Sequence, residues 1–253
     1  MKKILILLCI VSQNAFAQSA EDLFTQANAD YKQEKYQEAI KAYHQIEGLG
    51  FTSSELYYNL GNCYYKLNNV ASSIYNYEKA LLINPLNDDA KNNLVFAKRL
   101  TIDNIEELPK SLLQKVDEAF VKKLSYNEWA MVSVSLSILG SLLFLLFYFS
   151  YSSSKKRLFF VTSMLCFILL IISSVLAFKE YSYTINNIEA IIFAQEIEIK
   201  NAPTSNGEIV FTLHEGTKVK VLDTVDNWKK IRIADGKIGW ILANDLKILS
   251  TFR

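Results

Sequence analysis

Histidine and cysteine are scarce in this sequence, and the few present are poorly placed for metal binding or disulfide formation. The chain of 253 residues holds two histidines, His44 and His214, which lie far apart without ligand-like neighbours. Its three cysteines, Cys9, Cys63 and Cys166, each fall in a different kind of segment. We therefore expect neither a disulfide framework nor a zinc site, and we expect no bound cofactor.

The sequence also lacks the motifs of the common catalytic classes. It contains no G-x-S-x-G, no Walker loop and no H-E-x-x-H, and its acidic residues are scattered over predicted helix faces. These absences predict a protein without catalytic residues of its own. The formal net charge is only +1, which argues against nucleic acid as a partner.

Residues 1–17 have the three parts of a secretory signal peptide. Lys2 and Lys3 precede an apolar run over residues 4–11, and Ala15-Phe16-Ala17 forms an A-x-A cleavage site. The alternative is an N-terminal membrane helix, but the apolar run falls short of the roughly 20 residues that a span requires. We expect export from the cytoplasm and cleavage after Ala17.

An internal repeat follows the signal peptide. Residues 20–53 align with residues 54–87, each 34 residues long, and the aligned pairs are Leu23/Tyr57, Ala27/Gly61, Tyr31/Tyr65, Ile40/Ile74 and Tyr43/Tyr77. The second copy resembles the tetratricopeptide repeat (TPR) at Tyr57, Leu60-Gly61, Tyr64, Ser73, Tyr77, Ala80 and Pro85. The first copy departs from that pattern at Gln26, Asp30 and Phe51.

Apolar spacing predicts helices in this region independently of the resemblance. Leu60, Cys63, Tyr64 and Leu67 recur at helical spacing, which places Cys63 on the apolar side. Small residues at Gly61 and Ser73 would allow two helices to cross closely, as the repeat requires. We interpret residues 88–100 as a capping helix, so the predicted repeat domain covers residues 18–100.

The resemblance to tetratricopeptide repeats also implies a binding face. In that family the first helix of each repeat lines a concave groove that binds peptides or partner proteins. The corresponding residues of this chain are Asn28, Tyr31, Lys32, Asn59, Asn62, Tyr65, Lys66 and Asn93. Asparagine and lysine can hydrogen-bond an extended backbone or a carboxylate. The alternative is that these residues form solvated helix faces.

Residues 101–128 form an amphipathic bridge between the repeats and the next region. Its apolar stripe consists of Leu112, Leu113, Val116, Ala119, Phe120 and Leu124. Such a helix could lie on a membrane surface or pack under the repeat domain, and the sequence leaves both open. Ser125 and Glu128 then have the spacing of a capping box at the start of another helix.

Two uncharged apolar runs predict a transmembrane hairpin. The expected spans are residues 129–150 and 158–178, with Lys155, Lys156 and Arg157 in the turn at 151–157. The alternative is a buried helix pair in a soluble core. The basic turn is typical of a cytoplasmic loop, and an exported N-terminus then places both soluble domains on the extracytoplasmic side of the inner membrane.

The pattern changes to period two in residues 190–249, which predicts about five short strands and a small barrel. This region resembles the bacterial SH3 (SH3b) domain at Asn201-Ala202-Pro203, Leu213-His214-Glu215-Gly216-Thr217, Trp228, Asp235-Gly236 and Gly239-Trp240-Ile241. We expect His214 to be structural. The resemblance implies peptide or peptidoglycan binding, which would need an aromatic groove, although Phe193, Phe211 and Trp228 could equally be core residues.

The order of these parts resembles the BatE family over essentially the whole chain. The fold class we expect is multidomain, with an all-α TPR solenoid, a two-helix transmembrane hairpin and a small all-β SH3-like barrel. The resemblance implies an adaptor in an envelope complex, with Bat-type von Willebrand factor A domain proteins and a MoxR-type ATPase as partners, linked to oxygen or stress tolerance. Two alternatives stay open: a peptidoglycan-binding anchor and a transmembrane sensor.

Overall fold

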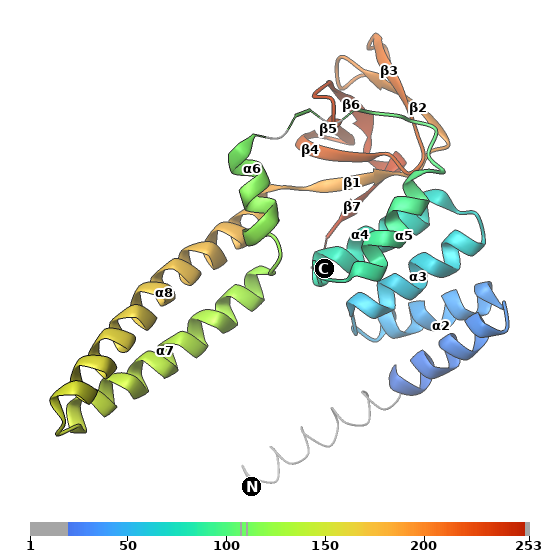
Figure 1. The fold of residues 1–253 in the computed structure, drawn as a ribbon. Coiled ribbons are helices and arrows are strands. Elements are labelled where there is room, and N and C mark those ends of the chain that lie inside the picture. Colours follow the sequence, from blue (N-terminus) through green and yellow to red (C-terminus); the bar gives the residue numbers. More distant parts are fainter. Residues whose placement is uncertain (1–19, 107, 110, 251–253) are drawn as a thin grey trace, which may run out of the picture. The chain divides into compact units, whose positions relative to one another are not determined.

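A computed structural model describes residues 20–106, 108–109 and 111–250 (Figure 1). The predicted signal peptide, residues 1–17, lies outside the described residues. The chain forms two compact units. The first combines the N-terminal helices with the C-terminal sheet, and the second consists mainly of Pro109–Ile188.

The predicted repeats form successive helix pairs in the first unit. Residues 20–32 are helical, and the helices after them are α2 (Tyr36–Gly48), α3 (Ser54–Lys66), α4 (Val70–Ile83) and α5 (Asp88–Lys98). The Ser53 hydroxyl accepts a hydrogen bond from the Leu56 amide at the start of α3. The Asn87 side chain does the same for Ala90 at the start of α5. Two polar residues therefore define where these helices begin.

The turn inside each helix pair repeats with the same period as the sequence. Glu34 and Asn68, 34 positions apart, both have a positive φ, at 61° and 56°. In the second pair, Gly61 lies against the ring of Tyr77, and a Cβ at this glycine would be 2.6 Å from the ring carbons. The Ser73 hydroxyl donates to the Gly61 carbonyl at 3.1 Å. The predicted close crossing of the two helices at Gly61 and Ser73 is therefore confirmed.

The C-terminal part of the first unit is a seven-stranded antiparallel sheet with the order β3-β2-β6-β5-β4-β1-β7. The strands are β1 (Glu189–Ile192), β2 (Glu196–Lys200), β3 (Ile209–His214), β4 (Lys218–Val225), β5 (Trp228–Arg232), β6 (Ile238–Leu242) and β7 (Leu246–Leu249). Because the described pairings end at β3 and β7, closure into a barrel is not confirmed. The sheet has seven described strands, so the prediction of about five was too low.

Strands β1 and β7 also complete the core of the repeat domain. Ile191 of β1 and Leu249 of β7 are buried in one cluster with Ile74, Tyr77 and Leu94 of the helices. The apolar end of a helical repeat array must be covered by a cap whose outer face is polar. The predicted capping helix forms as α5, and the sheet shares its role.

Asp103, in the segment that follows α5, binds the sheet through its carboxylate. Its carboxylate accepts hydrogen bonds from the His214 amide at 2.8 Å and the Thr217 hydroxyl at 2.6 Å, and it lies 2.7 Å from His214 Nδ1. Burial alone would raise the pKa of Asp103, but these hydrogen bonds outweigh burial and lower the pKa. The expectation that His214 is structural agrees with these contacts.

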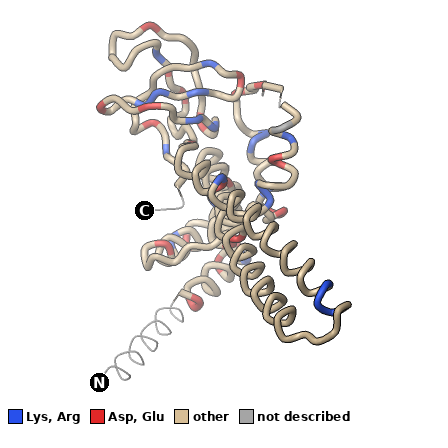
Figure 2. Tube along the Cα trace, turned by 90° about the vertical axis from the view of Figure 1, so that its left-hand side faces the viewer, with Lys and Arg blue, Asp and Glu red and all other residues tan. Residues whose placement is uncertain are grey.

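The second unit contains two helices long and apolar enough to cross a membrane, α7 (Tyr126–Phe149) and α8 (Ser153–Asn186). The predicted capping box of Ser125 and Glu128 is present at the start of α7. Charged residues are absent from most of both helices and gather where they meet (Figure 2). The first turns of α8 contain Lys155, Lys156 and Arg157, because no helix-breaking residue follows Ser152. The connection between α7 and α8 is therefore shorter than the predicted turn at 151–157.

Small polar residues line the contact between α7 and α8. The hydroxyls of Ser133 and Ser173 lie 2.8 Å apart, and Ser163 donates to the Gly140 carbonyl at 3.0 Å. Between apolar helices, small residues let the backbones approach, and hydroxyls supply hydrogen bonds.

The amphipathic bridge forms a short helix, α6 (Leu112–Val116), and a π-helical turn, η1 (Asp117–Val121). Leu112 is 81% exposed and Phe120 is 71% exposed. The Trp129 indole donates to the Val121 carbonyl at 3.0 Å, which joins this turn to the start of α7.

Candidate binding surfaces of the repeat domain

The predicted groove residues form a hydrogen-bonded unit that occurs twice. Asn28 Oδ1 accepts from the Tyr43 hydroxyl at 2.6 Å and from Asn59 Nδ2 at 3.1 Å. Asn62 Oδ1 accepts from the Tyr77 hydroxyl at 2.6 Å and from Asn93 Nδ2 at 2.8 Å. Every member of the second unit follows its counterpart by 34 positions. The repeat period therefore places the same polar group on successive helices.

These units hold the asparagines in fixed orientations. Since Oδ1 of Asn28 and Asn62 is occupied, the tyrosine and the next asparagine determine which way each amide points. Burial raises the pKa of Tyr43 and Tyr77, so both hydroxyls stay protonated and donate. No partner within the described residues takes the Nδ2 groups of Asn28 and Asn62, which leaves a donor at each repeat.

A small pocket of about 170 Å³ lies beside the second unit, and we call it the repeat pocket. Its lining contains five of the predicted residues, Tyr31, Asn62, Tyr65, Lys66 and Asn93, together with Tyr77 and Phe96. The other predicted residues lie outside this lining: Asn28 and Asn59 bond to one another, and Lys32 is exposed. Phe96 was missed, although its position one helical turn after Asn93 could have indicated it.

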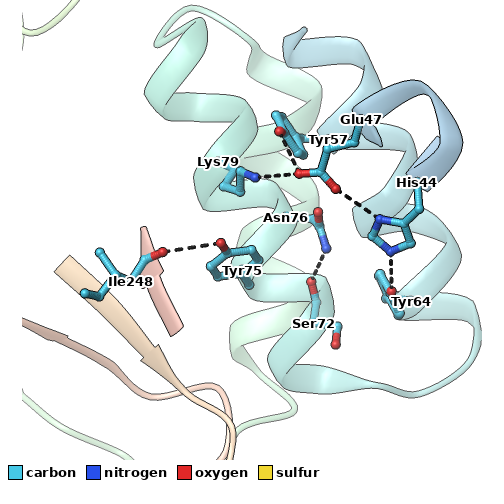
Figure 3. Close-up of polar contacts among 9 residues, drawn as sticks. All are labelled: His44, Glu47, Tyr57, Tyr64, Ser72, Tyr75, Asn76, Lys79 and Ile248. Atoms are coloured by element: carbon cyan, nitrogen blue, oxygen red, sulfur yellow. Dashed lines mark hydrogen bonds and ion pairs between the residues drawn. The ribbon is translucent and has the colours of Figure 1, made fainter. Parts of the chain in front are cut away.

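A second pocket, of about 800 Å³, lies where the helices meet strand β7, and we call it the junction pocket (Figure 3). The residues that line it are His44, Glu47, Gly50, Thr52, Tyr57, Tyr64, Ser72, Tyr75, Asn76, Lys79, Phe193, Lys247, Ile248 and Ser250. This pocket was not predicted from the sequence. Its lining comes from residues more than 150 positions apart and follows no single helical or strand period.

Glu47 is the centre of the polar contacts in the junction pocket. Its carboxylate binds Lys79 Nζ and the Tyr57 hydroxyl, each at 3.0 Å, and lies 3.0 Å from His44 Nδ1 (Figure 3). The hydrogen bond with His44 and the ion pair with Lys79 outweigh partial burial and lower the pKa of Glu47 to about 2. The carboxylate is therefore ionised at neutral pH. His44 Nε2 lies 3.0 Å from the Tyr64 hydroxyl, which extends the network across two helices.

The aromatic residues of the C-terminal sheet occupy different environments. Phe193 stacks edge-on against Tyr75 at a centroid distance of 5.7 Å and lines the junction pocket. Phe211 packs against the sheet core, and Trp228 is partly exposed. The three aromatics weighed from the sequence therefore do not form one groove on the sheet. Gly239 permits a close approach to Ile199 of the neighbouring strand.

Comparison with known families identifies two modules in the chain. A family model of the tetratricopeptide repeat matches residues 54–87, and a family model of the bacterial SH3 domain matches residues 197–247. No curated protein gives a significant match to the chain. The chain therefore contains a TPR and a bacterial SH3 domain, two modules typical of protein binding and, for the second, of cell-wall binding. In the described part of the chain, no group of three or more His, Cys, Asp or Glu residues is suited to hold a metal ion.

Proposed function

We propose that this chain is a non-enzymatic, membrane-anchored adaptor that binds an extended segment of a partner protein on its repeat helices. The observation that carries the proposal is the repeated Tyr–Asn–Asn unit. It orients one amide donor per repeat at regular spacing, and the backbone of an extended peptide presents acceptors at regular spacing as well. Lys66 in the repeat pocket adds a cation for an acidic group of the partner.

The test is photo-crosslinking from native membranes. A benzoylphenylalanine at Tyr65, in the repeat pocket, should crosslink to a protein that mass spectrometry identifies, and the double variant Asn62→Ala with Lys66→Glu should abolish the crosslink. The same group at Lys229, on β5, is the control position. A crosslink at Tyr65 that survives the double variant contradicts a role for these side chains.

The membrane part of the proposal is that α7 and α8 span the inner membrane and place both binding modules on its extracytoplasmic side. The apolar length of the two helices and the basic residues in the first turns of α8 support this orientation. An alkaline phosphatase fusion after Arg253 should be active, and a fusion at Ser154 should be inactive. The reverse pattern overturns the orientation.

The order of modules, which resembles the BatE family, supports a place in an envelope complex with Bat-type von Willebrand factor A domain proteins. Such partners would be the expected products of the Tyr65 crosslink. Crosslinked proteins without these domains would remove this part of the proposal while leaving the adaptor function intact.

A peptidoglycan anchor is the second candidate, and the match to the bacterial SH3 domain favours it. Because β1 and β7 share a core with the repeat helices, the assay requires the full chain in detergent. Co-sedimentation with purified sacculi would support the anchor, and protein that stays in the supernatant excludes it. A sensor is less well supported, since only Ser150–Ser152 separate α7 from α8.

A further inference from the structure

The junction pocket is separate from the repeat pocket of the proposed function. The two pockets share no lining residue. The junction pocket is formed by α2, α3, α4 and β7 and the segments beside them. Its volume of about 800 Å³ is within the range of ordinary ligand sites. Neither the repeats alone nor the sheet alone would form it.

Positive charge exceeds negative charge on the wall of this pocket. Glu47 is the one carboxylate side chain in the lining, and it is already bound to Lys79. Lys247 lies 4.2 Å from the centroid of the Phe193 ring, and no carboxylate within the described residues pairs with it. An ammonium group held over an aromatic ring in the lining of a polar pocket is suited to an anionic ligand.

The pocket also presents backbone groups of an edge strand. Strand β7 pairs with β1 on one side only. The Ile248 carbonyl points away from β1, because it accepts a hydrogen bond from the Tyr75 hydroxyl at 3.3 Å (Figure 3). In an antiparallel strand the N–H and C=O of one residue point to the same side, so the Ile248 amide also faces the pocket. Edge groups of this kind pair with extended chains.

A buried amide adds a third element of recognition. Asn76 is 5% exposed, and its Nδ2 donates to the Ser72 carbonyl at 2.8 Å. This hydrogen bond orients the Asn76 side-chain amide, and no group within the described residues donates to its Oδ1, which is available as an acceptor in the pocket lining. The rings of Tyr75 and Phe193 provide apolar walls beside it.

We propose that the junction pocket binds an extended, acidic peptide segment of a partner protein, with its carboxylates at Lys247 and its backbone along β7 and Asn76. The Glu47 network fixes Lys79, Tyr57 and His44, so the floor of the pocket is ordered before binding. This binding would require the repeats and the sheet to be docked. It would therefore add a second point of attachment to the one in the repeat pocket.

The experiment uses the full chain in nanodiscs on an array of octapeptides of random sequence, graded from strongly acidic to strongly basic. Binding should rise with negative charge. Lys247→Glu should weaken the acidic peptides by about tenfold or more, while Lys247→Arg should retain them. Lys229→Glu, three strands away on β5, is the matched charge control and should leave binding unchanged. Circular dichroism verifies that each variant is folded.

Three outcomes overturn the proposal. The first is binding that does not depend on peptide charge, and the second is an array without bound peptides. The third is binding of acidic peptides that persists in Lys247→Glu and disappears in Asn62→Ala with Lys66→Glu, which would assign the peptides to the repeat pocket. A loss confined to Lys247→Glu supports the junction pocket whether or not the repeat pocket binds a partner.

Discussion

The carboxylate of Glu78 lies 2.9 Å from the ammonium group of Lys218, which is 140 positions later in the chain. Glu78 also binds Lys98 at 2.9 Å, and Lys218 also binds Glu189 at 2.6 Å. The four alternating charges connect α5, α4, β4 and β1. Glu78 is only 7% exposed, so its charge depends on these partners.

Removal of one buried charge from this network should destabilise the first unit. Burial alone would raise the pKa of Glu78, but Lys218 and Lys98 outweigh it and lower the pKa. We expect Glu78→Gln to reduce the free energy of unfolding by about 2–3 kcal/mol, because it leaves Lys218 with one carboxylate. Chemical denaturation followed by tryptophan fluorescence measures the change. The double variant Glu78→Leu with Lys218→Met should recover most of the loss, and a double variant as unstable as the single one would contradict an electrostatic cause.

Glu47 should make stability fall in acid. Its folded pKa of about 2 lies below the ordinary value of 4.5, so its stabilisation is complete above about pH 4.5 and is lost as the pH falls toward 2. Glu47→Gln should therefore flatten the decline of the unfolding midpoint in that window. Glu198→Gln, an exposed carboxylate on β2, is the control and should keep the wild-type slope. Identical slopes for both variants would remove Glu47 as the cause.

Gly239→Ala should destabilise the sheet, since the new Cβ would overlap Ile199 Cγ2 and lie 3.0 Å from the Lys200 carbonyl oxygen. Ile199 is fully buried, so relief of the overlap must shift the core, at a cost of about 1–3 kcal/mol. Thermal unfolding provides the measurement. Gly48→Ala is the matched control, because nothing lies within 4 Å of its Cβ position, and it should cause no loss. Equal effects at the two glycines would count against the close approach.

The two Tyr–Asn–Asn units should contribute equally to stability. Tyr43→Phe and Tyr77→Phe each delete one buried hydroxyl that donates to an asparagine at 2.6 Å. We expect each to cost about 1 kcal/mol in the free energy of unfolding. Tyr65→Phe, at a more exposed ring, is the control. A large difference between the two buried tyrosines would show that the repeats are not energetically equivalent.

Asp103→Asn should release the segment before the second unit from the sheet. The neutral amide is a weaker acceptor for the His214 amide and the Thr217 hydroxyl. Amide hydrogen exchange at His214 and Thr217 should become faster, as mass spectrometry can detect. Glu106→Gln changes an exposed carboxylate in the same segment and should leave the exchange unaltered. Unchanged exchange in Asp103→Asn would show that the carboxylate does not hold the segment.

Local pattern was sufficient to predict the helices of the repeats, the two apolar helices and most of the strands. Structure over a few helical turns is determined by the spacing of Leu60, Cys63 and Leu67 and by the small residues Gly61 and Ser73. Asn62 and Asn93, both assigned to the predicted groove, are hydrogen-bonded to each other at 2.8 Å. These features follow from residues close together in the sequence, and the second repeat shows the same pattern as the first.

The junction between the repeats and the sheet could not be predicted in this way. Glu78, Lys218 and Asp103 are ordinary charged residues in sequence, and their importance comes from partners more than 100 positions away. Strand β1, Glu189–Ile192, is too short for alternation alone to show which elements it would pair with. The junction pocket forms only where the repeats meet the sheet, so no local sequence pattern marks the residues that line it.

The shared core has a consequence for the order of synthesis. Leu94 and Ala97 of α5 are made before the second unit, but Ile191 and Leu249, which cover the same cluster, follow it. The N-terminal helices therefore emerge from the ribosome with an apolar face that stays open until strand β7 has been made. Contacts of such long range slow folding and leave intermediates prone to aggregation. A chaperone that protects the early helices would thus be needed most while the last strands are still being translated.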